Sequence, residues 1–254
     1  MQRGGGMLEL TYSIETIAIL IVIALLVGFN KTALPSLGLF ILTMLMLLFP
    51  PRFAIGFMLP LLMVADLYAI IAYRKSVDWK RLIKLFPWVI VGLTIGYVTL
   101  LLIDEKHLKM MIGSIILLFI SMMFFRRKTN DNLLAGNHQA LLTTGFGIFG
   151  GFSTTVGNAG GEVMSVYLLL QRLPKAVFVG TVAYFFFVVN WVKLPLYWSI
   201  GLINREMLQL TLYLSLFILL GAYIGKRVLP HMKQKRFNQL ILFLTLLGAI
   251  NLFF

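Results

Sequence analysis

The sequence predicts an all-α integral membrane protein made of two inverted repeats, with about 8 to 10 membrane segments in total. Hydrophobic residues make up 60% of the 254 residues and charged residues only 12%, which is too apolar for a soluble domain. The second half repeats the pattern of the first, so we expect residues 1–128 to form one repeat and residues 129–254 the other. Each half opens with short apolar segments, which predicts broken or re-entrant half-helices there.

The duplication is visible at matched positions. At a shift of 123 residues, Gly28-Phe29 falls on Gly151-Phe152 and Pro51 falls on Pro174. Two later motifs align at a shift of 129, so a short insertion separates them from these anchors; they are Gly92-x-x-x-Gly96 and Gly221-x-x-x-Gly225. Glycines at this spacing let helices approach closely, and we interpret both motifs as helix-packing contacts.

Apolar runs give five expected segments in each half. In the first half they cover residues 13–29, 37–49, 53–73, 82–103 and 108–125. In the second half they cover residues 140–152, 163–170, 177–198, 207–228 and 237–254. A helix needs about 20 residues to cross the hydrocarbon core, so the last three segments of each half are credible spans. The first two of each half are short, which predicts half-helices or a re-entrant hairpin inside the protein.

The distribution of basic residues predicts that both termini lie outside. Most of the 22 Lys and Arg residues then fall in inward connections, and the outward connections hold only Arg3, Arg52, Lys106, Lys109 and Arg205. The loop after the third segment is basic in the first half and nearly neutral in the second, and the next loop shows the reverse. Two halves with exchanged loop charge are inverted relative to each other. The net charge of +13 therefore indicates membrane topology and not nucleic-acid binding.

Two polar interruptions form the candidate substrate site. Residues 153–161 lie between two short segments, and residues 30–36 are their counterpart in the first half. If a half-helix begins near Gly160, its free N–H groups and positive dipole end favour an anion. Amides, hydroxyls and one cation add hydrogen bonds, so the predicted substrate contacts are Asn30, Lys31, Thr32, Ser153, Thr154, Asn158 and Asn190. The alternative is that these groups only pack helices and cap their ends.

Asp66 and Lys193 are intramembrane charges and are therefore candidates for ion coupling or charge balance. Asp66 lies deep in the third segment, where it can bind a proton, balance Lys31 or form a buried structural pair. Lys193 shares a helix face with Asn190 and Tyr197. It either meets the anion or snorkels to the outer surface.

Glu162 is the third candidate for coupling or charge balance. It stands at the start of a short segment, where a carboxylate suits the helix dipole but repels an anionic substrate. It is therefore protonated, paired or coupled to transport; the alternative is a cap that faces solvent at the edge of a cavity. We interpret the aromatic residues 184–187 as core.

The chain resembles the TauE/SafE family of bacterial membrane transporters, the sulfite exporter family, over nearly its whole length. In the first half the likeness is carried by Gly28-Phe-x-Lys31-Thr32, Leu59-Pro60, Asp66, Tyr73-Arg74, Trp79, Pro87-Trp88, Gly92 and Gly96. In the second half it is carried by Asn158-Ala159, Gly161, Val163-Met164, Tyr167-Leu168-Leu169, Pro174-Lys175, Gly180-Thr181, Asn190, Lys193 and Pro195.

The resemblance implies a two-repeat helical transporter of the bacterial cytoplasmic membrane. Such a protein moves small anions such as sulfite, sulfoacetate or other organosulfonates, most often outward. Two positions depart from the family pattern. Glu162 stands where the family tends to have proline, and Ala33 stands where glycine commonly follows the threonine. The glutamate puts a simple anion pocket of the family type in doubt.

Other classes of function find little support. The chain has no cysteine, and its three histidines form no metal-ligand cluster, so we expect no cofactor and no metal. The polar groups are mostly amides and hydroxyls, which argues against an integral membrane enzyme. We expect a secondary transporter in the lipid bilayer with a small anionic substrate and protons as a candidate coupling ion. An uptake permease for a sulfur-containing or organic anion and a membrane scaffold subunit stay open, as does the oligomeric state.

Overall fold

The computed structural model describes residues 13–102 and 137–251, together with Asp104, His107, Met110 and Ser114. Within these residues the elements are helices, and no strand occurs, so the predicted all-α class is confirmed for this part of the chain. The predicted segment 108–125 lies almost entirely outside the described residues. Arg3, Lys106 and Lys109, three of the basic residues expected on the outer side of the membrane, are also not among the described residues.

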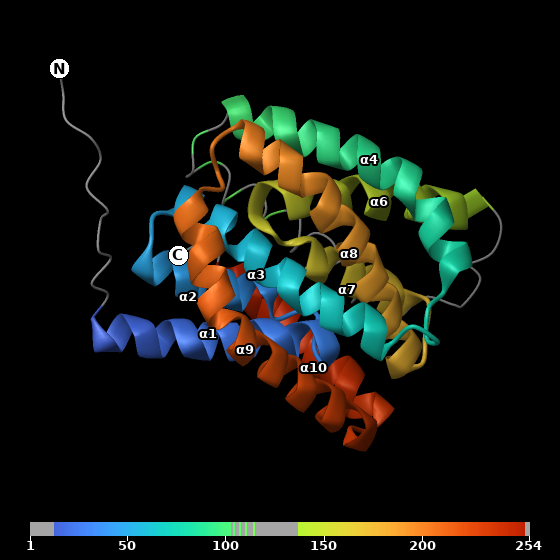
Figure 1. The fold of residues 1–254 in the computed structure, drawn as a ribbon. Coiled ribbons are helices and arrows are strands. Elements are labelled where there is room, and N and C mark those ends of the chain that lie inside the picture. The colour runs from blue at the N-terminus through green and yellow to red at the C-terminus, as the bar shows by residue number, and fades with distance from the viewer. Residues whose placement is uncertain are drawn as a thin grey trace.

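The helices follow one another in two similar series (Figure 1). Among the described residues, the first series contains α1 (Ile14–Thr32), α2 (Gly38–Leu48), α3 (Pro51–Ala72) and α4 (Trp79–Leu102). The second consists of α6 (Asn137–Gly157), α7 (Gly160–Leu170), α8 (Lys175–Ser199), α9 (Arg205–Val228), the 3-10 helix η2 (Leu229–His231) and α10 (Gln234–Asn251). Among the described residues, five helices are long and apolar enough to cross a membrane, namely α1, α3, α4, α8 and α9.

Prolines and an N-cap side chain fix where several helices begin. α3 starts after Pro50, with Pro51 in its first turn, and Pro174 is the N-cap of α8. Proline suits the start of a helix because the first turn leaves N–H groups unpaired in any case. At the start of α9, the Asn204 side chain accepts the Met207 N–H at 2.9 Å.

The first helix of each series is longer than predicted. α1 continues to Thr32 and α6 to Gly157, so residues 30–32 of the first polar interruption and residues 153–157 of the second form the last turns of a helix. The expectation of a short first segment is therefore wrong. The second segments are short, since α2 and α7 have 11 residues each, or about 16 Å of helix. Non-helical residues 33–37 separate α1 from α2, and residues 158–159 separate α6 from α7. α7 begins at Gly160, as predicted.

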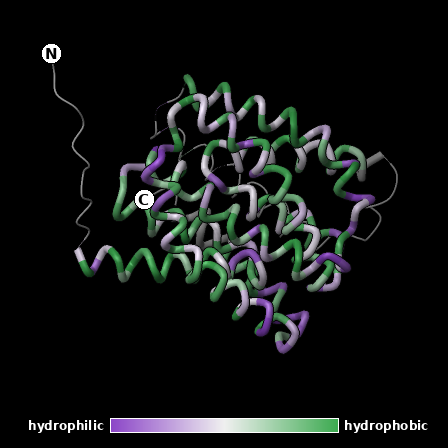
Figure 2. The backbone as a smooth tube through the Cα atoms, in the orientation of Figure 1, coloured by the Kyte–Doolittle hydropathy of each residue, from purple (hydrophilic) through white to green (hydrophobic). Residues whose placement is uncertain are grey.

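α3 and α8 lie in the interior, and α4 and α9 lie at the periphery. Buried residues make up 67% of the apolar stretch of α3 and 61% of that of α8, against 33% in both α4 and α9. The exposed side chains of the peripheral helices are large and apolar, for example Ile83, Ile90, Leu212 and Leu216. Figure 2 shows hydrophobic residues along the helices and hydrophilic ones mainly at their ends and in the turns. Such a surface suits helices that face lipid.

Glycines bring α1 against α9 and α4 against α6 (Figure 1). A Cβ at Gly28 would overlap backbone atoms of α9, and a Cβ at Gly221 would overlap backbone atoms of α1. The α4–α6 pair repeats this arrangement, because Gly92 and Gly151 each lie against the backbone of the opposite helix. The interpretation of the two glycine motifs as packing contacts is confirmed.

Candidate functional site

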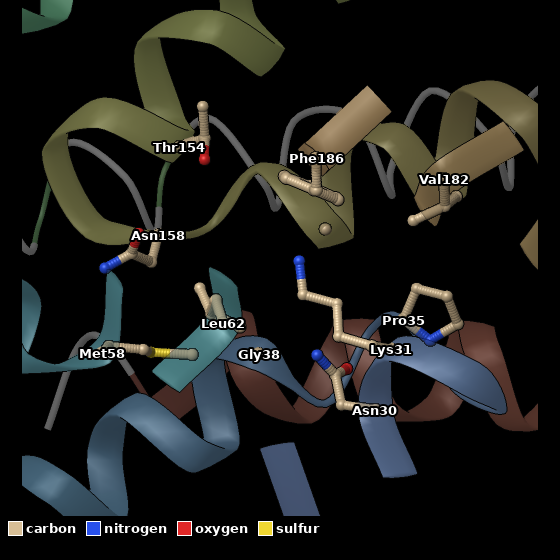
Figure 3. Close-up of a pocket in the computed structure, with 11 residues that line it drawn as sticks. Asn30, Lys31, Pro35, Gly38, Met58, Leu62, Thr154, Asn158, Val182 and Phe186 are labelled. Carbon is tan, nitrogen blue, oxygen red and sulfur yellow. The ribbon is translucent and has the colours of Figure 1, made fainter. Parts of the chain in front are cut away.

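A small polar cavity lies in the core, next to the short non-helical segments that follow α1 and α6. Its volume is about 20 Å³, which is room for about one water molecule. The polar side chains that line it are Asn30, Lys31, Thr154 and Asn158, and apolar side chains of α3 and α8 complete the wall. In Figure 3, Lys31 rises from the end of α1 toward Phe186, and Thr154 and Asn158 come from the end of α6.

Lys31 forms a buried ion pair with Asp66. Lys31 Nζ lies 2.7 Å from Asp66 Oδ1, and both side chains are at most 3% exposed. Asn190 Nδ2 donates to the other carboxylate oxygen at 2.6 Å. The Lys31 ammonium also lies over the Phe186 ring, 4.4 Å from its centroid. Asp66 therefore balances Lys31, one of the roles that the sequence left open, and the network joins α1, α3 and α8.

Lys193 is a second buried cation, and its neighbours are neutral. Its ammonium donates to Asn158 Oδ1 at 2.5 Å and to Thr154 Oγ1 at 3.4 Å, and it lies 5.0 Å from the centre of the Tyr197 ring. It forms no ion pair with a carboxylate of the described residues. Its side chain is fully buried, so the alternative of snorkelling to the outer surface is wrong. The two residues that hold it, Thr154 and Asn158, line the cavity.

Glu162 lies between the first turns of the two short helices. Glu162 Oε1 accepts the Leu39 N–H in the first turn of α2 at 2.9 Å, while Glu162 itself belongs to the first turn of α7. The second oxygen, Oε2, has no hydrogen-bond partner among the described residues. The residue is fully buried, so the alternative of a solvent-facing cap is wrong. A Cβ on the cavity residue Gly38 would lie 3.5 Å from Oε1, which places the carboxylate beside the cavity.

The remaining predicted substrate contacts do not all reach the cavity. Four of the seven line it, namely Asn30, Lys31, Thr154 and Asn158. The Thr32 hydroxyl points to α9, where it donates to the Ala222 carbonyl at 2.8 Å. The Ser153 hydroxyl donates to a carbonyl of its own helix at 3.4 Å. Neither Thr32 nor Ser153 lines the cavity, and Asn190 stands behind Asp66.

Phe186 lines the cavity, although its sequence context predicted only a place in the core. A signal for it exists in the spacing along α8. Val182, Phe186, Asn190, Lys193 and Tyr197 follow one another at intervals of four, four, three and four residues, and such residues share one helix face. The face that carries the polar residues Asn190 and Lys193 therefore continues upstream to Phe186 and Val182, which line the cavity.

Two tyrosines cap the ends of the long helices that lead to the cavity. Tyr73 donates from its hydroxyl to the Thr32 carbonyl at 2.6 Å, and Tyr197 donates to the Thr155 carbonyl. These carbonyls lie in last helical turns, where backbone partners run out. Burial raises the pKa of the Tyr73 hydroxyl, so it stays a proton donor. The role of Tyr73 was not predicted from the sequence, because its partner lies 41 residues away.

The site is equipped to bind a small anion. Lys31 supplies an ammonium group, and Asn30, Thr154 and Asn158 supply neutral hydrogen-bonding groups around one cavity. In the described part of the chain, no cluster of three or more His, Cys, Asp or Glu residues is placed to hold a metal ion.

The comparison with protein families agrees with this chemistry. A family model described as "Sulfite exporter TauE/SafE" matches residues 20–252, which is nearly the whole chain. The match includes every residue that lines the cavity. No curated protein and no solved structure gives a significant match.

Proposed function

The chain belongs to the TauE/SafE sulfite exporter family of membrane transporters, and from this membership we propose that it moves a small anion across the cytoplasmic membrane. The proposed substrates are sulfite, sulfoacetate and related organosulfonates, and the proposed direction is export. Uptake of a similar anion is the alternative, because the same carrier runs in either direction with its gradient.

The observation that carries the proposal is a buried ammonium group at a polar cavity between two helix breaks. Broken helices that meet in the core are the usual place for substrate sites in secondary transporters. The Lys31 ammonium faces this cavity, and the Lys193 ammonium lies directly behind Thr154 and Asn158. Asp66 offsets the charge of Lys31, so with Glu162 protonated the charge of Lys193 remains, and a bound oxyanion would offset it.

The cavity has to open before a substrate enters. A volume of about 20 Å³ holds about one water molecule, which leaves no room for sulfite or a sulfonate. We propose that the two halves of the chain rock against each other and expose the cavity to each side in turn.

We propose that the halves are inverted repeats, residues 1–128 and 129–254, related by an axis through the cavity. Contacts between equivalent positions support this. Leu39 donates to Glu162, 123 residues away, and Asn190 donates to Asp66, 124 residues away. The packing of α1 on α9 and of α4 on α6 is reciprocal in the same way. A residue contacts its own counterpart only close to a symmetry axis.

Glu162 is the proposed proton-coupling group. When ionised, it places a negative charge beside the cavity, where it repels an arriving anion. When protonated, it loses that charge and gains a donor for its unpartnered oxygen. The other charged groups of the site do not offer this switch as directly, since Asp66 is paired with Lys31. An anion would then move together with a proton, and net export follows when the outward anion gradient dominates.

The proposed orientation places both termini outside, with the bacterial cytoplasmic membrane as the location. The basic residues at the ends of α3 and α9 support it, because cytoplasmic connections carry an excess of Lys and Arg.

Transport by purified protein in liposomes tests the proposal. Uptake of radiolabelled sulfite and of a short sulfonate is followed with and without an inward-directed proton gradient. We expect saturable flux that responds to the gradient and falls strongly in Lys31→Ala. Lys84→Ala removes an exposed lysine from α4 and is the matched control, which should keep wild-type flux.

Absence of flux for any small anion, from protein shown to be folded, would contradict the proposal. It would favour the scaffold alternative. Saturable flux that is equal in wild type and Lys31→Ala would keep the transporter but place its site elsewhere.

A further inference from the structure

A second and larger pocket lies away from the transport cavity, where α3, α9 and η2 meet. Its volume is about 410 Å³, within the range of small-molecule sites. It is lined by Tyr68 of α3, by Tyr223, Lys226 and Arg227 at the end of α9, and by Pro230 and His231 of η2. We call it the α3–α9 pocket. None of its lining residues takes part in the transport cavity.

The α3–α9 pocket carries positive charge, from Lys226 and Arg227. No carboxylate lines it, and neither Lys226 nor Arg227 forms an ion pair with a described residue. The helix dipole of α9 favours cations at this end, which accounts for part of their placement. It does not account for a hollow between them.

The pocket side chains are also oriented. The Arg227 guanidinium lies over the Tyr223 ring, 5.2 Å from its centroid. His231 Nδ1 lies 2.9 Å from the Arg227 carbonyl oxygen, which can only accept, so Nδ1 carries the hydrogen and this bond fixes the ring beside the pocket. Planar guanidinium groups, ammonium groups and hydroxyls at one place are the donors that bind phosphate.

The surroundings of the pocket favour a lipid as the source of that phosphate. On α3, Leu67 and Ile71 flank Tyr68 and are 47% and 71% exposed. On α9, Leu220 and Ile224 flank Tyr223 and are 47% and 43% exposed. These apolar faces are where acyl chains would lie, while tyrosines beside basic residues mark the level of the headgroups. A soluble phosphate compound would make no use of the apolar faces.

We propose that the α3–α9 pocket binds the headgroup phosphate of one acidic phospholipid from the leaflet at this end of the molecule. Lys226 and Arg227 hold the phosphate, His231 forms part of the pocket wall, and the acyl chains lie along the exposed faces of α3 and α9. The lipid thereby bridges an interior helix and a peripheral one. The proposal does not depend on the identity of the transported substrate.

Native mass spectrometry of the full chain in a neutral detergent tests the proposal. The probes are phosphatidylglycerol, the zwitterionic phosphatidylcholine, and free glycerol phosphate. We expect one tightly held phosphatidylglycerol on the wild-type protein. Lys226→Gln with Arg227→Gln should weaken that binding by at least about tenfold, given the affinity that each basic residue adds for an anionic headgroup. Tyr223→Leu keeps both charges but removes the ring under Arg227, and it should weaken binding several-fold.

The matched control is Lys235→Gln with Arg236→Gln, which removes the same charge from exposed positions outside the pocket. It should retain the bound lipid. Equal loss in the control would overturn the proposal, because delocalised charge and not the pocket would then hold the lipid. Equal retention of phosphatidylcholine, or equally tight binding of free glycerol phosphate, would overturn it as well. If the pocket double variant fails to fold, Tyr223→Leu decides, and unchanged lipid binding there would contradict the proposal.

Discussion

Removal of the Lys31 charge alone should destabilise the protein, whereas removal of both charges of its ion pair should not. Lys31 Nζ and Asp66 Oδ1 lie 2.7 Å apart, with both side chains buried, so their Coulomb attraction at an effective dielectric constant of 20 is roughly 6 kcal/mol. Burial costs each ion several kcal/mol, so the intact pair contributes little net stability. In Lys31→Met the carboxylate keeps its bond from Asn190 but loses its counter-charge, and the expected loss is about 3–5 kcal/mol.

The double variant Lys31→Met with Asp66→Asn removes both charges at similar volume. Its free energy of unfolding should lie within about 1 kcal/mol of wild type. The measurement is SDS-induced unfolding followed by tryptophan fluorescence. The control is Arg81→Met, which breaks a partly exposed pair with Asp78, 30% and 20% exposed, and should cost less than about 1 kcal/mol. Equal destabilisation of the single and double variants would refute the reasoning, because the penalty would then not come from an unpaired charge.

Transport measurements on the same variants distinguish a loss of substrate binding from a loss of stability. The double variant is expected to be stable but lacks the ammonium group at the cavity. A hydrogen bond from a charged group contributes about 1.5–3 kcal/mol, so the KM for sulfite in liposomes should rise about 10- to 150-fold. A wild-type KM in a stable double variant would remove Lys31 from the substrate site.

Three further substitutions test the packing, a helix cap and the coupling group. Gly151→Ala places a Cβ against the backbone of α4 and should cost about 1–3 kcal/mol in the SDS titration, whereas Gly145→Ala on the same helix, where a Cβ meets nothing within 4 Å, should be neutral or stabilising. Tyr197→Phe leaves a carbonyl at the end of α6 unpaired and should cost about 1–3 kcal/mol, while the exposed Tyr213→Phe should change stability by less than about 0.5 kcal/mol. Glu162→Gln removes the charge at constant shape, so anion flux should lose the increase toward acidic pH that we expect of wild type; a retained pH profile would exclude Glu162 as the coupling group.

The membrane-spanning helices could be predicted from the sequence because the bilayer imposes one simple requirement. A segment that faces lipid has to be apolar over about 20 residues, and composition alone reveals it. The packing role of the glycine motifs could also be predicted, since a residue without a Cβ lets two helix backbones approach closely in any context. The start of α7 at Gly160 could be predicted from the glycine-rich stretch that precedes its apolar run.

The ends of α1 and α6 could not be predicted, because their polar residues are satisfied by distant partners. The Thr32 hydroxyl bonds back to the Gly28 carbonyl within its own helix and forward to α9, so a polar residue continues the helix and does not break it. Its carbonyl is capped by Tyr73, which is far away in the sequence. Lys193 presents the same difficulty, since only the tertiary fold reveals that Asn158 and not the membrane surface receives its ammonium group.

In the proposed two-fold arrangement the backbone is duplicated between the two halves, but the charged side chains are not. The caps are duplicated, because Tyr73 and Tyr197 bond equivalent carbonyls. The charged groups are not duplicated: at the shifts of 123 and 124, Lys31 corresponds to Thr154, Asp66 to Asn190, and Glu162 to Leu39. An equivalent backbone in the two halves lets the carrier reach its two open states by similar movements. Because the charges belong to single positions, an anion at the axis meets the same charged groups in both proposed states, with Lys31, Asp66 and Glu162 beside it and Lys193 behind Thr154 and Asn158. Its binding energy therefore need not change when the halves exchange conformations.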